Sequence, residues 1–185
     1  MTEARRLIAA IGDLSYFGLG MACVADITAA EVARRLEAVP ADDEDVGAII
    51  ENLGSHLDDN LTVVGVTAVP GGCVVSQPWG YIPYTPGVAK RLSAGTAYYG
   101  MYDNPKGGHH GTAFRDGVME EGDTHPGAGG AYPDDSAEEI LATYLYHHHA
   151  VAYCCARIGL RLDDARAITG PPDMWLRLPE RDWWN

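Results

Sequence analysis

The stretch that decides the fold contains four short runs that favour β-structure: LTVVGVTAV (61–69), CVVSQ (73–77), TAYYGMY (96–102) and HHGTAFR (109–115). Turn segments containing proline and glycine join these runs in pairs. Runs rich in valine, threonine and tyrosine between such turns are typical of β-hairpins. The sequence therefore predicts two hairpins, with a short helix over 86–95 between them.

Two further runs extend the predicted sheet. VMEEG (118–122) follows the turn Arg115-Asp116-Gly117 and predicts a third antiparallel strand after the second hairpin. MACVADI (21–27) is apolar throughout and indicates a strand or an extended lead-in. Because its turns are the best specified, we expect the second hairpin with its third strand to lie at the centre of the sheet.

Helix signals stand on both sides of these strands. Thr28 and Glu31 form a capping box, and the following helix ends before Pro40. Ser136 opens the longest predicted helix, which runs to about Ile158 before Gly159. The fold class is therefore α+β, with an antiparallel sheet of about four to six strands packed against helices from both chain ends. We expect a single domain over 1–185, with a glycine-rich loop at 122–135 and a Trp-containing tail at 171–185.

Composition narrows the class of function. The chain has 185 residues and a net charge of −13, from 26 acids against 13 bases. Such a balance argues against binding to nucleic acid, which needs a basic face, and fits either a solvated surface or a basic partner. The acidic run at 42–45 suits the start of a helix or, less well, a calcium loop. No run is long and apolar enough for a membrane span and no secretory signal is present, so we expect a cytoplasmic protein with no membrane contact.

The four cysteines lack the spacing of a zinc ribbon or a disulfide scaffold, so reduced and buried thiols are expected.

Several of these motifs together resemble an uncharacterised actinobacterial domain family of unknown function. The resemblance covers most of the chain and rests on caps and turns: Cys23, the helix Thr28-x-x-Glu31-Val32-x-Arg34-Arg35-Leu36, the segment Arg91-Leu92-Ser93-Ala94-Gly95-Thr96, the turn Asp116-Gly117, and the helix end Gly159-Leu160-Arg161-Leu162. The family implies no activity, and no functional residue is carried over from it.

The histidines give one candidate site. His147, His148 and His149 lie on the longest predicted helix, where His148 falls on the apolar face with Leu145 and should be buried. One hypothesis is a metal site in which His148 joins His109 and His110. The alternative is a buried core histidine paired with a tyrosine or a carbonyl.

Aromatic residues give a second candidate site. The segment Gln77-Pro78-Trp79-Gly80-Tyr81 is dense in rings, and these side chains could line a pocket or simply fill the core. Trp183 and Trp184 stand at the C-terminus, where an unpacked chain is normally polar. They either dock on their own subunit or anchor a partner. The candidate binding residues are therefore Trp79, Tyr81, Trp183 and Trp184.

The sequence carries no nucleophile elbow, phosphate loop or dinucleotide fingerprint. The function expected is that of a non-enzymatic acidic binding protein, of an immunity-like, inhibitor or accessory kind, which uses its surface, a protein partner and no cofactor. One alternative is a small enzyme or metalloprotein that uses the histidine-rich zone. Another is a subunit of a larger assembly, and the oligomeric state is open.

Overall fold

The protein is an α+β structure. The computed structural model describes residues 2–12, 18–51, 62–104, 108–123, 125–128 and 132–185, which contain one antiparallel sheet of eight strands. In chain order the elements are α1 (Glu3–Ile11), β1 (Leu19–Ala25), α2 (Ala29–Leu36), β2 (Val39–Pro40), α3 (Asp43–Glu51), β3 (Val63–Val69), β4 (Gly72–Pro78), the 3-10 helix η1 (Ile82–Tyr84), α4 (Pro86–Leu92), β5 (Ala97–Asn104), β6 (Gly108–Arg115), β7 (Val118–Asp123), α5 (Ala137–Tyr146), α6 (Ala150–Ile158), α7 (Arg166–Thr169) and β8 (Met174–Arg177).

The sheet is larger than the four to six strands predicted. Its order is β2-β8-β3-β4-β1-β5-β6-β7, so short strands from distant parts of the chain extend it beyond the two hairpins. β8 pairs with β3 on one side and with β2 on the other. Both added strands are brief, at four and two residues, and therefore lack the alternating pattern that reveals a strand in sequence.

The predicted hairpins themselves are confirmed. β3 pairs with β4, from Gly65 opposite Ser76 to Val69 opposite Gly72. β5 pairs with β6 along its whole length, and β7 adds to β6 after a tight turn.

The second hairpin does not lie at the centre of the sheet, which contradicts the prediction. β4 and β1 occupy the middle, and β7 forms one edge. β1 pairs with β4 on one side and β5 on the other, so it separates the two hairpins. A well-specified turn sequence predicts that its two flanking strands pair with each other. It does not predict which strand lies next to the hairpin in the sheet.

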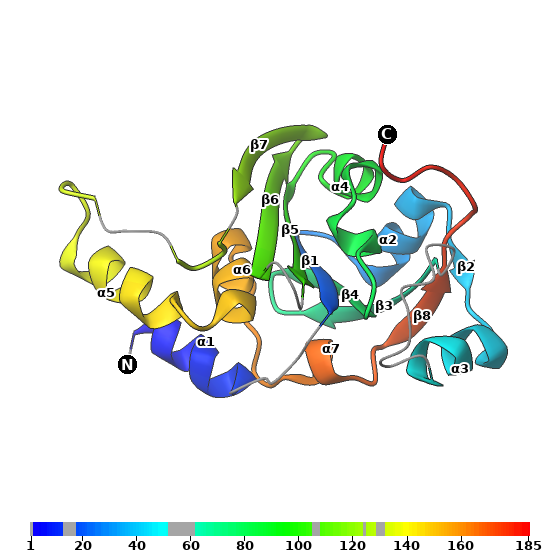
Figure 1. The fold of residues 1–185 in the computed structure, drawn as a ribbon, viewed down its shortest axis with the longest axis horizontal. Helices are drawn as coiled ribbons and strands as arrows, with labels where there is room; N and C mark the ends of the chain where they lie inside the picture. The colour runs from blue at the N-terminus through cyan, green and yellow to red at the C-terminus, as the bar shows by residue number, and fades with distance from the viewer. Residues whose placement is uncertain (1, 13–17, 52–61, 105–107, 124, 129–131) are drawn as a thin grey trace.

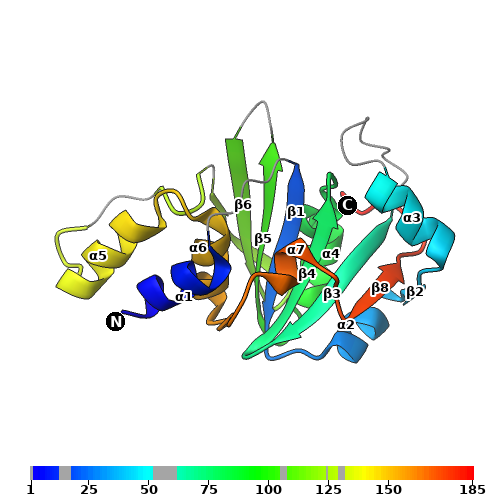
Figure 2. The same cartoon turned by 90° about the horizontal axis from the view of Figure 1, so that it is seen from below.

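Helices cover both faces of the sheet, as Figures 1 and 2 show. One face carries α1, α6 and α7 over a core that includes Met21, Cys23 and Tyr99. The other face carries α2, α4 and η1 over a core that includes Val24 and Tyr98. The molecule therefore has three layers, and its central strands are apolar on both sides because neither side meets water.

Residues 136–158 do not form the single helix predicted. α5 begins at the capping box of Ser136 and Glu139, as expected, but it ends at Tyr146. α6 begins at Ala150, after His149 adopts a non-helical φ of −129° and ψ of 57°. A turn of three histidines thus separates two shorter helices.

The C-terminal segment packs back on the fold. The Trp183 ring is buried, with the guanidinium of Arg181 at 5.0 Å and that of Arg91 at 5.8 Å from its centroid. Glu37 binds both guanidinium groups, at 2.8 Å to Arg91 and 2.7 Å to Arg181. Gly87 donates its backbone N–H to the Trp183 carbonyl at 2.7 Å. The side chains of Glu37 just after α2, of Arg91 on α4 and of Arg181 in the tail therefore hold the Trp183 segment in place, and we call this group the Trp183 clasp.

The turn between β6 and β7 generates a stability prediction. Asp116 and Gly117 both have positive φ, at 50° and 76°. We expect Gly117→Val to lower the free energy of unfolding by about 1–2 kcal/mol, because a β-branched L-residue is strained in this conformation. Chemical denaturation measures the change.

Gly122→Val is the matched control for that turn. Gly122 lies in β7 with open space around its missing side chain and without a positive φ. Its replacement should change the stability by no more than roughly 0.5 kcal/mol. Equal losses in the two variants would show that the turn geometry is not what matters at Gly117.

The ion pairs of Glu37 in the Trp183 clasp lead to a prediction about how the stability of the fold depends on pH. Hydrogen bonds from Arg181 and Arg91 lower the pKa of Glu37 from 4.5 to about 2. A depressed pKa in the folded state adds stability above the unfolded pKa, and this stability is lost as the pH falls through the folded pKa. The difference in unfolding free energy between the native chain and Glu37→Gln should thus be constant above pH 4.5 and shrink as pH falls toward 2. Glu44→Gln, at an exposed position of α3, controls for the loss of one surface charge, and a difference that does not shrink would rule out the contribution of these ion pairs to stability.

Candidate functional site

An open cleft of about 650 Å³ lies between β7, α5 and α6. Its described lining contains four carboxylates, three tyrosines and a single cation, Arg157: Glu121, Asp123, Asp135, Glu139, Tyr132, Tyr146, Tyr153 and Arg157. β7 supplies two of the acids because of its pleat. Glu121 stands opposite Ala113 and Asp123 opposite Gly111, so both lie on the face of the sheet that carries α6.

Most of the carboxylates in the cleft are held by neutral donors. Asp123 accepts from the Tyr99 hydroxyl at 2.8 Å and from the backbone N–H of His125 at 2.9 Å. Asp135 accepts from the backbone of Tyr132, and Glu139 from the backbone of Ser136, each at 2.7 Å. These bonds fix the orientation of the acids without cancelling their charge. Only Glu121 meets a cation among the described residues, since it forms an ion pair with Arg157.

Tyrosine rings form the inner wall of the cleft. Tyr153 packs edge-on against Tyr146 at 6.0 Å and against Tyr99 at 5.8 Å between ring centroids. Burial raises the pKa of all three hydroxyls, and nearby acids add to the effect, although Arg157 opposes it at Tyr153. The phenols therefore stay neutral around neutral pH; Tyr146 and Tyr153 line the cleft beside the negative groups, whereas Tyr99 is buried.

The arrangement suits a positively charged group. Carboxylates attract it, and aromatic faces favour cations that have lost part of their water. This cleft could not be predicted from sequence patterns, because its residues come from β7, the following loop and two helices. The sequence does contain two features related to this cleft: the tyrosines at 146 and 153, and the adjacent acids at 120 and 121.

A second cleft, of about 550 Å³, lies beside β2 and β8. Its charges largely pair within the protein: Arg177 lies 3.4 Å from Asp45, and Glu37 belongs to the Trp183 clasp. This second cleft therefore has fewer charged groups without an ion-pair partner than the cleft at β7.

The prediction that His148 is buried is wrong. His147 and His148 are both exposed in the turn between α5 and α6, with His147 Nδ1 3.1 Å from His148 Nε2. His149 is half-buried. The helical geometry on which the prediction depended ends at Tyr146, so the periodic assignment does not reach these residues.

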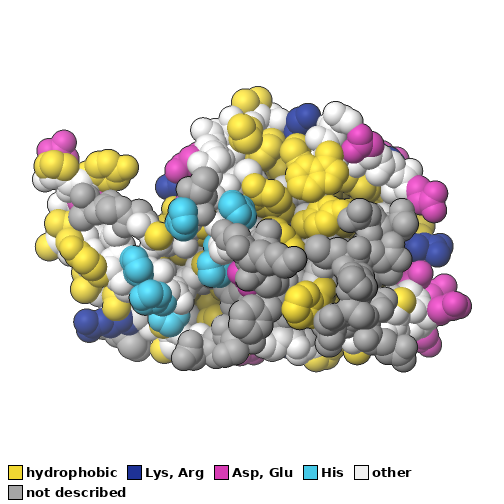
Figure 3. All heavy atoms as spheres, in the orientation of Figure 1, with side chains coloured by type: hydrophobic (Ala, Val, Ile, Leu, Met, Phe, Trp, Pro, Cys, Tyr) yellow, Lys and Arg dark blue, Asp and Glu magenta, His cyan; other side chains and the backbone are white. Residues whose placement is uncertain are grey.

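The other candidate metal ligands lie on β6. His109 Nε2 is 3.5 Å from Asp103 Oδ1, and His110 stands opposite Tyr102. Figure 3 shows histidine side chains gathered toward the α5 and α6 end of the face it views. Within the described ranges, no three side chains of His, Cys, Asp or Glu are grouped as a metal ion would need. A metal site formed by His109, His110 and His148 stays a prediction.

The predicted aromatic binding residues fall into different environments. Tyr81 and Trp184 contact each other, with ring centroids 5.5 Å apart, and Trp184 is 51% exposed. Trp183 is buried in the clasp, as expected for docking on its own subunit. Trp79 lies against Gly18 with a φ of 57°. Tyr81 and Trp184 thus form one small surface, to which the buried Trp183 does not contribute.

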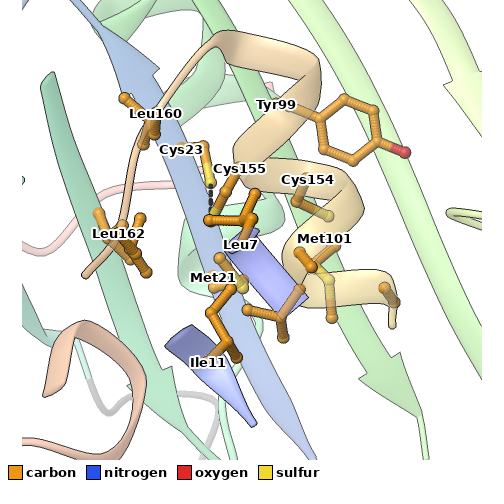
Figure 4. Close-up of a cluster of buried hydrophobic side chains, with 14 of the residues drawn as sticks. Leu7, Ile11, Met21, Cys23, Tyr99, Met101, Cys154, Cys155, Leu160 and Leu162 are labelled. Carbon is orange, nitrogen blue, oxygen red and sulfur yellow. Dashed lines mark hydrogen bonds between the residues drawn. The ribbon is translucent and has the colours of Figure 1, made fainter. Parts of the chain in front are cut away.

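The cysteines are free and buried, which confirms the expectation for them. Cys23 on β1 contacts Cys155 on α6, with the sulfurs 3.7 Å apart (Figure 4). Burial raises the pKa of Cys23 and Cys154 and brings that of Cys73 to about 11. These thiols therefore act as core residues that join the helices to the sheet.

In the part of the chain that the structure describes, every helix is too short or too polar to cross a membrane. Comparisons with protein-family models, with curated proteins and with solved structures find no match to this chain. The resemblance to an actinobacterial family of unknown function stays a prediction, and the geometry of the cleft carries the functional argument.

Proposed function

We propose that this chain is a non-enzymatic acidic binding protein, of an immunity-like, inhibitor or accessory kind, that recognises a cationic group of a protein partner. The observation that carries the proposal is the cleft at β7, whose described lining sets four carboxylates and three tyrosines against one arginine. A guanidinium or ammonium group is the complementary ligand.

The way the acids are held supports tight recognition of such a group. Because Asp123, Asp135 and Glu139 already accept from neutral donors, they need little reordering when a cation arrives. A cation placed over the ring of a lining tyrosine such as the exposed Tyr132 would add a cation–π attraction of about 0.5–1 kcal/mol. A planar guanidinium gains most, since it can stack on a ring and bind a carboxylate at the same time.

The net charge of the whole chain also favours binding to a basic partner. A net charge of −13 attracts basic partners over distances comparable with the Debye length, which raises the rate of association. The cleft then supplies the selectivity that net charge alone does not give.

The test uses a short peptide of alternating arginine and threonine, with a glutamate–threonine peptide of the same length as its opposite. We expect the arginine peptide to bind, and the double variant Asp123→Asn, Asp135→Asn to weaken its affinity by roughly two- to thirtyfold, as the loss of two exposed ion pairs predicts. Fluorescence anisotropy measures the affinity.

The matched control is the double variant Asp43→Asn, Glu44→Gln, which also removes two charges but lies on α3, outside the cleft. Its affinity should stay close to that of the native chain. Equal weakening in both variants would assign binding to net charge alone. Failure of the arginine peptide to bind better than the glutamate peptide would overturn the proposal.

A further inference from the structure

β7 forms an open edge of the sheet. It is the last strand in the order and pairs with β6 on one side, while no described strand pairs with its other side. Its first five residues are all exposed, with Val118 at 65% and Met119 at 59%. Figure 1 shows β7 at the margin of the sheet, beside β6. Among the described strands, none therefore uses the outer row of backbone N–H and C=O groups of β7, which are the groups that an added strand would pair with.

The two edges of the sheet differ. β2, at the opposite edge, has only two residues, and one of them is Pro40, which lacks an N–H donor. Short length and proline are the usual protections against strand addition. β7 has six residues and no proline, so these two protections are missing at the edge that borders the cleft, although a bulge interrupts its pairing with β6 between Met119 and Glu121.

The geometry of β7 links this edge to the cleft. Glu121 and Asp123 lie on the α6 side of the sheet and line the cleft. A strand added beyond β7 would lie about 4.8 Å away and would place every second side chain on that same side. Its alternate residues would thus enter the cleft, while its backbone paired with β7.

Charge decides which strand fits. A second copy of this chain, paired through its own β7, would set a strand with three acids and no base against an identical strand, and like charges opposite one another destabilise a sheet. A segment with arginine or lysine at alternate positions would instead place positive charges beside these acids. The edge therefore discriminates against self-pairing and favours a basic partner.

We propose that β7 accepts an extended basic segment of a protein partner as an added antiparallel strand, with alternate basic side chains in the cleft at Glu121 and Asp123. The inference rests on the proposed function and specifies how the partner is held. Backbone pairing supplies affinity that is independent of sequence, and the cleft selects the side chains, as in other strand-addition complexes.

The test uses the arginine–threonine peptide and two N-methylated isomers of it. Only alternate amides of an added antiparallel strand point at its neighbour. One isomer carries methyl groups on the arginine amides and the other on the threonine amides, so the two have the same charge and composition. We expect one isomer to bind at least about tenfold more weakly than the parent peptide, and the other to stay within about threefold of it.

Hydrogen exchange gives the second measurement. The parent peptide should slow exchange of backbone amides in Val118–Asp123, and the weak isomer should not. Equal affinities of the two isomers, or selective weakening without protection of β7, would overturn strand addition at β7 and leave cation recognition intact. Failure of the parent peptide to bind would overturn the proposed function and this inference together.

Discussion

The structure depends on strand β1, which is buried on both faces of the sheet. This strand pairs with β4 and β5 at its two edges and is buried along its whole length, so every side of it is occupied by protein. Met21 and Cys23 pack beneath one layer of helices, while Ala22 and Val24 pack beneath the other. Even Gly20 has no room for a side chain, since a Cβ there would lie 2.2 Å from the Gly80 carbonyl oxygen. The hairpins and both helical layers take their positions from this strand.

The parts of the fold that depend on neighbours in sequence could be predicted. The hairpins, the β7 strand and the caps at Thr28 and Ser136 each follow from residues a few positions apart. The insertion of β1 between the hairpins could not, because pairing between distant strands depends on how the whole sheet buries its faces. β8 could not either, since Met174–Arg177 is too short to show a period.

The break between α5 and α6 explains why the cleft was not found from sequence. In one continuous helix, Tyr146 and Tyr153 would be separated by about 10.5 Å along the axis. The turn at His147–His149 ends that regular rise, and the two rings lie 6.0 Å apart. Apolar periodicity continues across the turn and conceals it. The same turn puts His148 in water, so a single local feature accounts for both the missed site and the wrong prediction of burial.

The acids of β7 have partners that can be exchanged. Glu121 pairs with Arg157 and Glu120 with Arg115, and the side chains in both pairs are roughly half exposed. An exposed ion pair is worth about 0–1 kcal/mol, because water screens it and two long side chains lose freedom in forming it. In the proposed complex, replacement of Arg157 by a partner's guanidinium would therefore cost little, and the backbone of β7 would add hydrogen bonds to the partner. These internal pairs neutralise Glu120 and Glu121 when the edge is free, while Asp123 accepts only from neutral donors.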